Sequence, residues 1–298
     1  GGADVSVLVT KQIDGNRTNW LAGEHYTFTI AAQDGRVIAT ETIADTDADK
    51  QFTIALTGER YTAAGTYHYR ITEQVGTQGG VTYDTAERRF AVVVADSDMD
   101  GDLEITAVNN KLNTAASGSW LVRADFTNVY TPVGTAHAVI NVEKAMNGNH
   151  ALSGYQFALY DVDPANSSEA NEIIRSPITD AAGKTSIPLT YSAADAGKTY
   201  TYYLAEINRG ETINNIRYDA TVYKVEVSII DNLDGTVSTN TLISGLPGVA
   251  TVPVFTNEYV PSASDYITLS GKKVIRGDRV LNAGEFEFVI AAATAGAP

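Results

Sequence analysis

The sequence predicts an all-β protein made of tandem domains, and three observations support this. Its 298 residues are enough for two or three domains. The 16 tyrosines favour strands, and residues 67–73 alternate between apolar and polar side chains with a period of two. Four sequence blocks recur in the same order along the chain, which indicates repeated domains.

The first repeated block places a lysine at the end of an apolar strand. Each copy contains lysine, any residue, an apolar residue, any residue and then glycine. The three copies are residues 7–15, 140–148 and 269–277. The third copy begins a unit that contains only about two strands before the sequence ends, and two strands cannot close a core by themselves.

Three further blocks occur twice each. A Tyr-x-Tyr strand ends in glutamate, a short block contains Tyr-Asp, and a closing strand reads Phe-Thr-Asn-x-Tyr. The copies are residues 65–73 and 198–206, 81–85 and 216–220, and 126–132 and 255–261. Proline ends both closing blocks and would stop a strand there. We therefore expect domains at residues 1–132 and 133–261, with residues 262–298 forming the truncated start of a third repeat.

Strand alternation identifies polar residues on otherwise apolar faces, because successive side chains point to opposite sides of a strand. Each complete repeat has one lysine, one glutamate and one asparagine in phase with its buried positions. These residues are Lys11, Glu73 and Asn128 in the first repeat and Lys144, Glu206 and Asn257 in the second. In the third repeat, alternation with Ile267 and Leu269 selects Lys273 over Lys272 as the candidate third-domain lysine.

A buried lysine, glutamate and asparagine could react with one another. Burial disfavours both charged forms, so a proton can pass from lysine to glutamate and leave a nucleophilic amine. The glutamic acid would donate a hydrogen bond to the asparagine carbonyl, and attack would release ammonia and form a Lys–Asn isopeptide bond. The reaction would run once per domain, without turnover.

Two other interpretations of these residues are a buried ion pair beside a hydrogen-bonded asparagine, and lysines on an exposed edge. Repetition of the set favours the bond.

The blocks together resemble the Gram-positive pilin and adhesin stalk domains that carry intramolecular isopeptide bonds. The similarity is to the streptococcal major-pilin type and to collagen-adhesin B-type domains. It covers both complete repeats and the start of the third. It implies an immunoglobulin-like β-sandwich whose first and last strands are adjacent. It also implies crosslinks Lys11–Asn128 and Lys144–Asn257, catalysed by Glu73 and Glu206, with Lys273 as the third lysine. No Tyr-Pro-Lys motif of the sortase-polymerisation kind and no wall-sorting signal are present.

Composition restricts the class of partner. The net charge of -15 argues against binding to nucleic acid or anionic lipid and suits a secreted or wall-displayed protein. The chain has no cysteine, which excludes disulfides, and no apolar run as long as a membrane span. We expect an extracellular, cell-wall-anchored piece of a longer surface protein without a cofactor. Its expected partners are neighbouring domains or subunits and host surface molecules.

One acidic loop resembles the start of a calcium site. Residues 96–104 supply Asp96, Asp98 and Asp100, but Ala107 stands where an EF-hand loop needs a bidentate glutamate. A solvated turn is favoured, with these aspartates as weak metal candidates. The four histidines are scattered, without metal-ligand spacing.

The leading functional hypothesis is a structural stalk or shaft segment of a surface adhesin or pilus. The alternative is an adhesin domain that recognises a host protein or glycan, for which the insertion at 161–176 is the one modest candidate site. Conventional enzyme turnover is disfavoured, because all the polar clusters that stand out belong to the repeats.

Overall fold

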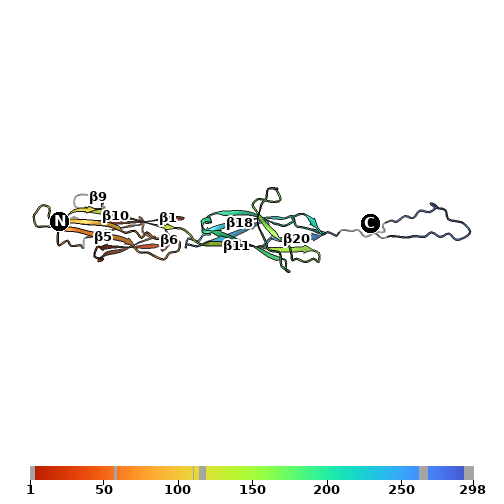
Figure 1. The fold of residues 1–298 in the computed structure, drawn as a ribbon, viewed down its shortest axis with the longest axis horizontal. Coiled ribbons are helices and arrows are strands. Elements are labelled where there is room, and N and C mark those ends of the chain that lie inside the picture. The colour runs from red at the N-terminus through yellow and green to blue at the C-terminus, as the bar shows by residue number, and fades with distance from the viewer. Residues whose placement is uncertain (1–3, 57–58, 110, 114–118, 262–267, 292–298) are drawn as a thin grey trace. The chain divides into compact units, whose positions relative to one another are not determined.

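The computed structural model describes residues 4–56, 59–109, 111–113, 119–261 and 268–291 (Figure 1). Residues 1–259 form one compact unit and residues 260–298 a second. The first unit contains two β-sandwiches in succession, so the predicted all-β class with tandem immunoglobulin-like sandwiches is confirmed. We call strands β1–β10 the first sandwich and strands β11–β20 the second sandwich.

The first sandwich consists of two sheets. One sheet has the order β4-β1-β10-β6, with β9 paired to β10, and the other has the order β3-β2-β5-β7-β8. The strands of the first sheet are β1 (Asp4–Gly15), β4 (Gln51–Ala55), β6 (Val81–Thr82), β9 (Lys111–Asn113) and β10 (Ser119–Tyr130). The strands of the second are β2 (His25–Ala32), β3 (Val37–Ala44), β5 (Gly65–Glu73), β7 (Arg88–Ala95) and β8 (Glu104–Asn109).

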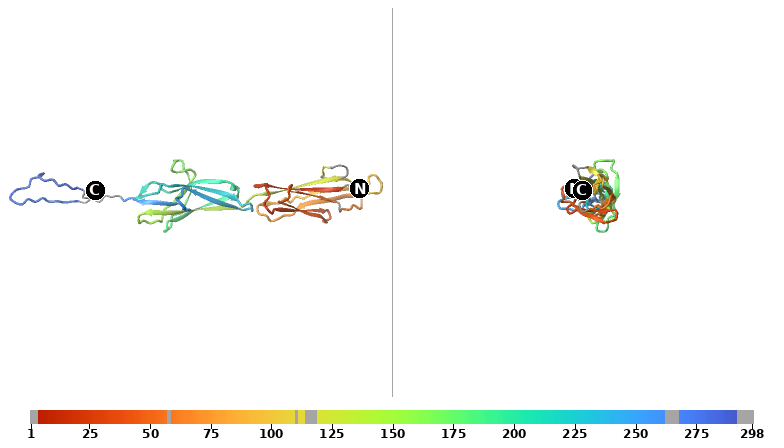
Figure 2. Two further views of the ribbon diagram at one scale, coloured as in Figure 1. Left: turned by 180° about the vertical axis from the view of Figure 1, so that it is seen from behind. Right: turned by 90° about the vertical axis from the view of Figure 1, so that its left-hand side faces the viewer.

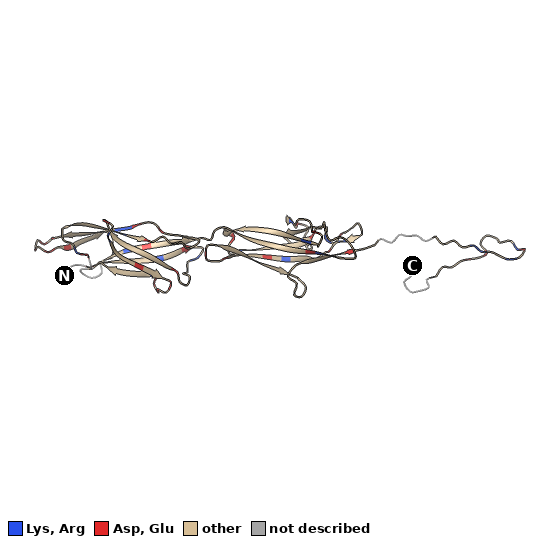
Figure 3. Ribbon diagram, turned by 90° about the horizontal axis from the view of Figure 1, so that it is seen from below, with Lys and Arg blue, Asp and Glu red and all other residues tan. Residues whose placement is uncertain are grey.

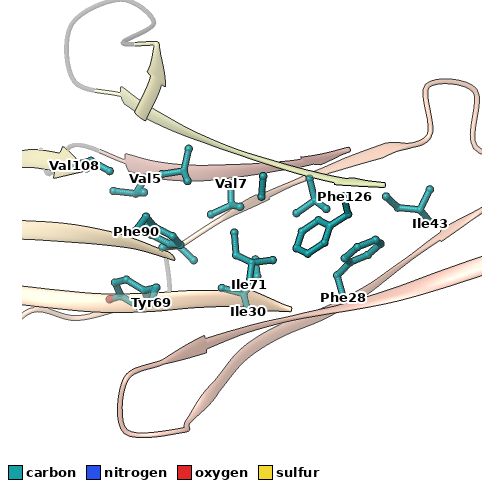
Figure 4. Close-up of a cluster of buried hydrophobic side chains, with 14 of the residues drawn as sticks. Val5, Val7, Phe28, Ile30, Ile43, Tyr69, Ile71, Phe90, Val108 and Phe126 are labelled. Carbon is teal, nitrogen blue, oxygen red and sulfur yellow. The ribbon is translucent and has the colours of Figure 1, made fainter. Parts of the chain in front are cut away.

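A single apolar core fills the space between these two sheets (Figure 4). Alternate residues of β1 and β10 point into it and meet alternate residues of the facing sheet. Phe28 of β2 and Phe126 of β10 lie with their ring centroids 5.1 Å apart. The alternation read from the sequence therefore places the predicted faces of β1 and β10 in the core.

The second sandwich repeats this plan. One sheet has the order β14-β11-β20-β17-β16 and the other β13-β12-β15-β18-β19. The strands of this sandwich are the yellow-green to blue arrows in Figure 2. The strands of the first are β11 (Thr135–Asn147), β14 (Lys184–Ser192), β16 (Thr212–Ile213), β17 (Ile216–Arg217) and β20 (Val254–Tyr259). The strands of the second are β12 (Phe157–Tyr160), β13 (Glu172–Arg175), β15 (Thr199–Glu206), β18 (Val222–Asp231) and β19 (Val237–Ser244). A 3-10 turn, η1 (Ala193–Asp195), follows β14.

The first and last strands of each sandwich are hydrogen-bonded neighbours and run parallel. Strand β1 pairs with β10, and strand β11 pairs with β20. Parallel neighbours cannot be joined by a tight hairpin, so the rest of the sandwich forms the connection between them. The adjacency of first and last strands, expected from the resemblance, is present in both sandwiches.

The predicted third repeat, residues 262–298, differs from the expectation of about two strands. Its described residues, 268–291, contain no strand, and Leu269 and Lys273 are exposed. The predicted inward face therefore does not form in this part of the chain, since no facing sheet covers it. Ile267, which was assigned to the same face, lies outside the described residues, as does the expected domain start at residue 262.

Positions of basic and of acidic residues both occur along the ribbon of the two sandwiches (Figure 3). In the described part of the chain, no helix is long and apolar enough to cross a membrane.

Candidate functional site: a buried Lys–Glu–Asn cluster in each sandwich

The first sandwich brings Lys11, Glu73 and Asn128 together in its core. The Lys11 ammonium donates to Glu73 Oε2 at 2.8 Å, and the Asn128 amide nitrogen donates to Glu73 Oε1 at 2.6 Å. The side chains of Lys11 and Glu73 are fully inaccessible to solvent, and Asn128 is buried as well. One carboxylate thus contacts both the amine and the amide.

The second sandwich contains the same arrangement. Lys144 lies 2.9 Å from Glu206 Oε1, and the Asn257 amide nitrogen donates to that same oxygen at 3.0 Å. Lys144 also donates to the backbone carbonyl of Phe255 at 3.1 Å. Both ionisable side chains are again inaccessible to solvent. The six residues selected from strand alternation therefore form two buried clusters.

The parallel pairing of first and last strands positions the amine beside the amide. Lys11 lies opposite Phe126 in the β1–β10 register, and Lys144 lies opposite Phe255 in the β11–β20 register. In each case the asparagine is two residues further along the last strand. Side chains two residues apart share a face, so lysine and asparagine both point into the core. The glutamate ends a strand of the opposite sheet, β5 or β15.

Burial changes the acidity of both partners in the direction that a proton transfer requires. Desolvation lowers the pKa of Lys11, and the nearby Glu73 carboxylate opposes this shift. Desolvation raises the pKa of Glu73, against the hydrogen bonds from Lys11 and Asn128. The pKa values of Lys144 and Glu206 move in the same directions, with desolvation as the main cause. Both shifts lower the cost of transferring a proton from the lysine to the glutamate in each cluster.

One tyrosine ring lies beside each lysine nitrogen. The Lys11 nitrogen lies 4.8 Å from the ring centroid of Tyr26, and the Lys144 nitrogen lies 5.0 Å from that of Tyr155. Each ring shields one side of the nitrogen from water, while its face attracts the ammonium form of the lysine.

The asparagine carbonyl contacts a group that the sequence reasoning did not assign. The backbone N–H of Asp84 donates to Asn128 Oδ1 at 2.8 Å, and that of Asp219 donates to Asn257 Oδ1 at 2.8 Å. A backbone N–H can only donate, so it fixes which end of the amide is the oxygen. The expectation that glutamate polarises this carbonyl was therefore wrong in its geometry, because the glutamate faces the amide nitrogen in both sandwiches. The recurring Tyr-Asp block was the available signal for these two aspartates.

Among the described residues, the first sandwich has a second buried ion pair that the second sandwich lacks. The Arg17 guanidinium forms two hydrogen bonds with the Glu24 carboxylate, at 2.8 and 2.9 Å, and both side chains are almost fully buried. The guanidinium also lies 4.7 Å above the ring of Tyr130. His150 occupies the position six residues after the lysine where the first repeat has Arg17. A search for repeated polar residues therefore could not find this pair.

The remaining candidates lie on the surface. The ligand atoms of Asp96, Asp98 and Glu104 come within 4.8 Å of one another, whereas Asp100 is not part of that group. Asp96 accepts hydrogen bonds from the backbone N–H groups of Asp100 and Gly101, as in a self-capped turn. The ammonium of the exposed Lys273 lies 4.8 Å above the ring of Phe286.

The insertion at 161–176 contains β13 and a turn. The Asp161 carboxylate accepts hydrogen bonds from both the backbone and the side-chain nitrogen of Asn171. Internal bonds of this kind hold the two ends of the turn together.

Comparison with known proteins gives one family match. The model of the family described as "FctA: Spy0128-like isopeptide containing domain" matches residues 7–131 and 140–260. A comparison with curated protein sequences found no significant match. Among solved structures, the major pilin of Streptococcus pyogenes is 17% identical, with 87% of this chain and 99% of that chain covered and a TM-score of 0.31. The shaft pilin SpaA of Lactobacillus rhamnosus GG is 14% identical, with 87% and 99% covered and a TM-score of 0.26.

Proposed function

Because the chain belongs to the family of Spy0128-like isopeptide-containing domains, we propose that a Lys–Asn isopeptide bond closes each of its sandwiches. The bonds join Lys11 to Asn128 and Lys144 to Asn257. The single observation that carries the proposal is the duplicated cluster, in which one buried glutamate contacts both the amine and the amide.

The proposed reaction begins with transfer of a proton from the Lys11 ammonium to Glu73, which burial favours. The neutral amine attacks the Asn128 side-chain carbonyl carbon and forms a carbon–nitrogen bond. The new linkage loses one proton and the amide nitrogen gains one, with Glu73 as the shuttle. The old carbon–nitrogen bond then breaks and ammonia leaves. Glu206 serves Lys144 and Asn257 in the same way. Each cluster reacts once, so no turnover follows.

The bond would stabilise the sandwich by constraining the unfolded chain. It closes a loop from residue 11 to residue 128, and by analogy with disulfides such a loop contributes about 5 kcal/mol. It also joins the first strand to the last strand. When the chain is stretched, tension acts on these two strands, because they lead to the preceding and the following segments of the chain. A domain of this kind resists unfolding under tension and proteolysis.

These properties suit a stalk or shaft segment of an extracellular, cell-wall-anchored adhesin or pilus of a Gram-positive bacterium. The partners of such a segment are neighbouring domains or subunits of the same surface structure, and host surface molecules are a further class of partner. The pilins named above are shaft and major pilins, which agrees with this role. The net charge of -15 suits a displayed, soluble surface.

Intact mass spectrometry tests the proposal directly. The purified chain should be lighter than its sequence by two ammonia molecules, one for each sandwich. Peptide mapping should recover fragments in which Lys11 is joined to Asn128 and Lys144 to Asn257. A mass equal to that of the unmodified sequence would show that the clusters are ordinary buried ion pairs.

A further inference from the structure

The geometry points to a second catalytic group in each cluster: the backbone amide of Asp84 in the first sandwich and of Asp219 in the second. This inference rests on the proposed function. Each amide acts as an oxyanion donor that stabilises the charge developing on the asparagine Oδ1 during attack. The carboxylate of the same aspartate is a positioning group, which holds the strand that carries the asparagine.

The hydrogen bond to the reacting carbonyl is the most constant feature of the two clusters. Its length is 2.8 Å in both sandwiches. The glutamate contacts vary more, since Asn128 bonds to its glutamate at 2.6 Å and Asn257 at 3.0 Å. An oxyanion donor must point at the oxygen that becomes negative, at about 2.7–3.1 Å. Both backbone amides meet this requirement.

The aspartate carboxylates fix the position of these amides relative to the asparagine. Asp84 Oδ2 accepts from the backbone N–H of Thr127 at 3.2 Å, and Asp219 Oδ2 accepts from that of Thr256 at 2.6 Å. Each threonine directly precedes the reacting asparagine. One residue therefore contacts the last strand twice, once through its carboxylate and once through its amide.

Each aspartate is in turn held by its own loop. Arg88 donates to both carboxylate oxygens of Asp84, at 3.1 and 2.5 Å. Asp219 Oδ1 accepts from the backbone N–H of Thr221 at 2.8 Å, and its own N–H lies 3.1 Å from Glu206 Oε2 as well. Asp84 Oδ1 also accepts from the backbone N–H of Ala86 at 3.1 Å, so the same aspartate turn recurs in both loops, and Arg88 adds to it at Asp84. The recurring turn keeps the same backbone amide at the asparagine oxygen in both sandwiches.

The roles of the two groups follow from the positions of the asparagine atoms. As the Lys11 nitrogen bonds to the Asn128 carbonyl carbon, the carbonyl electron pair moves onto Oδ1, where the Asp84 N–H stabilises it. When the pair returns, the bond to Nδ2 breaks and that nitrogen leaves as ammonia with a proton from Glu73, which already faces it. The glutamate thus transfers protons, and the backbone amide stabilises the oxyanion.

Replacing one amide by an ester tests the oxyanion role with a single-atom change. Cell-free synthesis can introduce the α-hydroxy analogue of aspartate at position 84, which replaces the N–H by oxygen and keeps the carboxylate. Samples quenched over time are digested, and the Lys11–Asn128 and Lys144–Asn257 fragments are quantified. We expect the first crosslink to form about 100-fold more slowly, the usual effect of losing one oxyanion donor. The second crosslink, in the same molecules, should keep its rate.

Controls separate this role from a general effect on folding. In a Glu73→Gln background, where the first bond does not form, ester and amide chains should melt at closely similar temperatures. The ester at position 219 should reverse the pattern and slow only the second crosslink. Equal crosslinking rates for ester and amide would overturn this inference alone. A chain with no crosslinked fragment in either sandwich would overturn the proposed function, and this inference with it.

Side-chain variants test the positioning role of the Asp84 carboxylate. They remain informative even if the ester-containing chain fails to fold. Asp84→Ala removes the acceptor that holds the Thr127 N–H, whereas Asp84→Asn keeps a carbonyl oxygen there. We expect Asp84→Ala to slow the first crosslink by about 10-fold or more, because small misplacements of reacting groups are costly, and Asp84→Asn to recover most of the rate. Unchanged rates in both variants would contradict the positioning role.

Discussion

Each cluster places a lysine and a glutamate where neither is favoured as an ion. An ammonium and a carboxylate buried this completely lose most of their hydration, and their mutual attraction only partly replaces it. Moving one proton removes both charges and leaves the two contacts as ordinary hydrogen bonds. The proton transfer that would make the amine nucleophilic is therefore also the change that removes the cost of burying two charges.

Substituting the glutamate of one sandwich should prevent the crosslink in that sandwich and leave the other crosslink unchanged. In Glu73→Gln the shuttle is lost but the side chain keeps its size and can still hydrogen-bond. We expect a mass deficit of one ammonia in place of two, and a loss of about 5 kcal/mol in the first sandwich, since its loop is no longer closed. Mass spectrometry and calorimetry measure these effects. Glu206→Gln is the matched control and should affect only the second sandwich; a remaining deficit of two in either variant would exclude that glutamate as the catalyst.

Removing the lysine should make stability depend on pH in a defined direction. In Lys11→Met, Glu73 stays buried without its cation, so its folded-state pKa lies further above the ordinary value of 4.5. The folded state then binds a proton that the unfolded state has released, and stability falls as pH rises above 4.5 through the folded-state pKa. The melting temperature of the first sandwich should therefore decrease across that range. Adding Glu73→Gln should abolish the dependence, and a melting temperature that increases with pH would contradict the argument.

Among the elements, the pairing of first and last strands defines the site. Strand alternation identified the inward-facing residues of β1, β5 and β10, because one face of each strand is buried and the period of two is regular. Alternation does not give register, so the placement of Lys11 opposite Phe126 required the structure. The repeat supplied part of the missing information. The same polar residues recur at matched spacing in both copies, which indicated that they meet in the folded domain.

Other parts of the site could not be predicted from side-chain patterns. The donor to the asparagine carbonyl is a backbone N–H, and its direction depends on the path of a loop that the residue types do not encode. The Arg17–Glu24 pair is close in sequence but not repeated, so nothing distinguished it from surface charge. For Lys273, alternation indicated an inward face, but a face becomes buried only when a second sheet covers it, and residues 268–291 form no strand.

The β1–β10 crosslink should change how the first sandwich responds to force. Tension enters at the start of β1 and leaves at the end of β10, so the Lys11–Asn128 bond carries it directly between the two strands. Single-molecule pulling should show no extension from the segment between residues 11 and 128. Asn128→Ala should add one unfolding event, whereas Asn257→Ala should add one from the second sandwich only. An additional event of that length in the unsubstituted chain would contradict a load-carrying bond.

At the scale of the whole molecule, the two sandwiches within the unit of residues 1–259 share a contact. The Tyr130 hydroxyl donates to Asp231 Oδ1 at 2.6 Å and accepts from the Gly235 N–H at 3.2 Å. The Val133 N–H donates to the Gly235 carbonyl at 2.9 Å. Tyr130 ends β10, the strand that carries Asn128, so the strand that the proposed crosslink would hold is also the one that contacts the second sandwich.

Close backbone packing at this contact makes it sensitive to a single methyl group. A Cβ at Gly235 would lie 2.5 Å from backbone atoms of Gly79 and Gly80, and Gly235 has a φ of +92°. Gly101 occupies the corresponding turn of the first sandwich with the same φ of +92°, but a Cβ there would meet nothing within 4 Å. Gly101→Ala therefore reproduces the backbone strain without the clash. This makes it a matched control for Gly235→Ala.

We expect Gly235→Ala to open the contact between the sandwiches while leaving both cores and both crosslinks intact. The Val133 N–H would lose its acceptor, so its hydrogen exchange should accelerate, whereas amides in the centres of β1 and β11 should keep their protection. Gly101→Ala should leave Val133 exchange unchanged, and Tyr130→Phe should accelerate it by removing the hydroxyl that bonds to Asp231 and Gly235. Equal Val133 exchange in Gly235→Ala and Gly101→Ala would show that the contact does not hold the sandwiches together. A faster rate in Gly235→Ala and Tyr130→Phe but not in Gly101→Ala, with the mass deficit preserved, would show that the chain stiffens its sandwiches covalently and joins them by hydrogen bonds and packing.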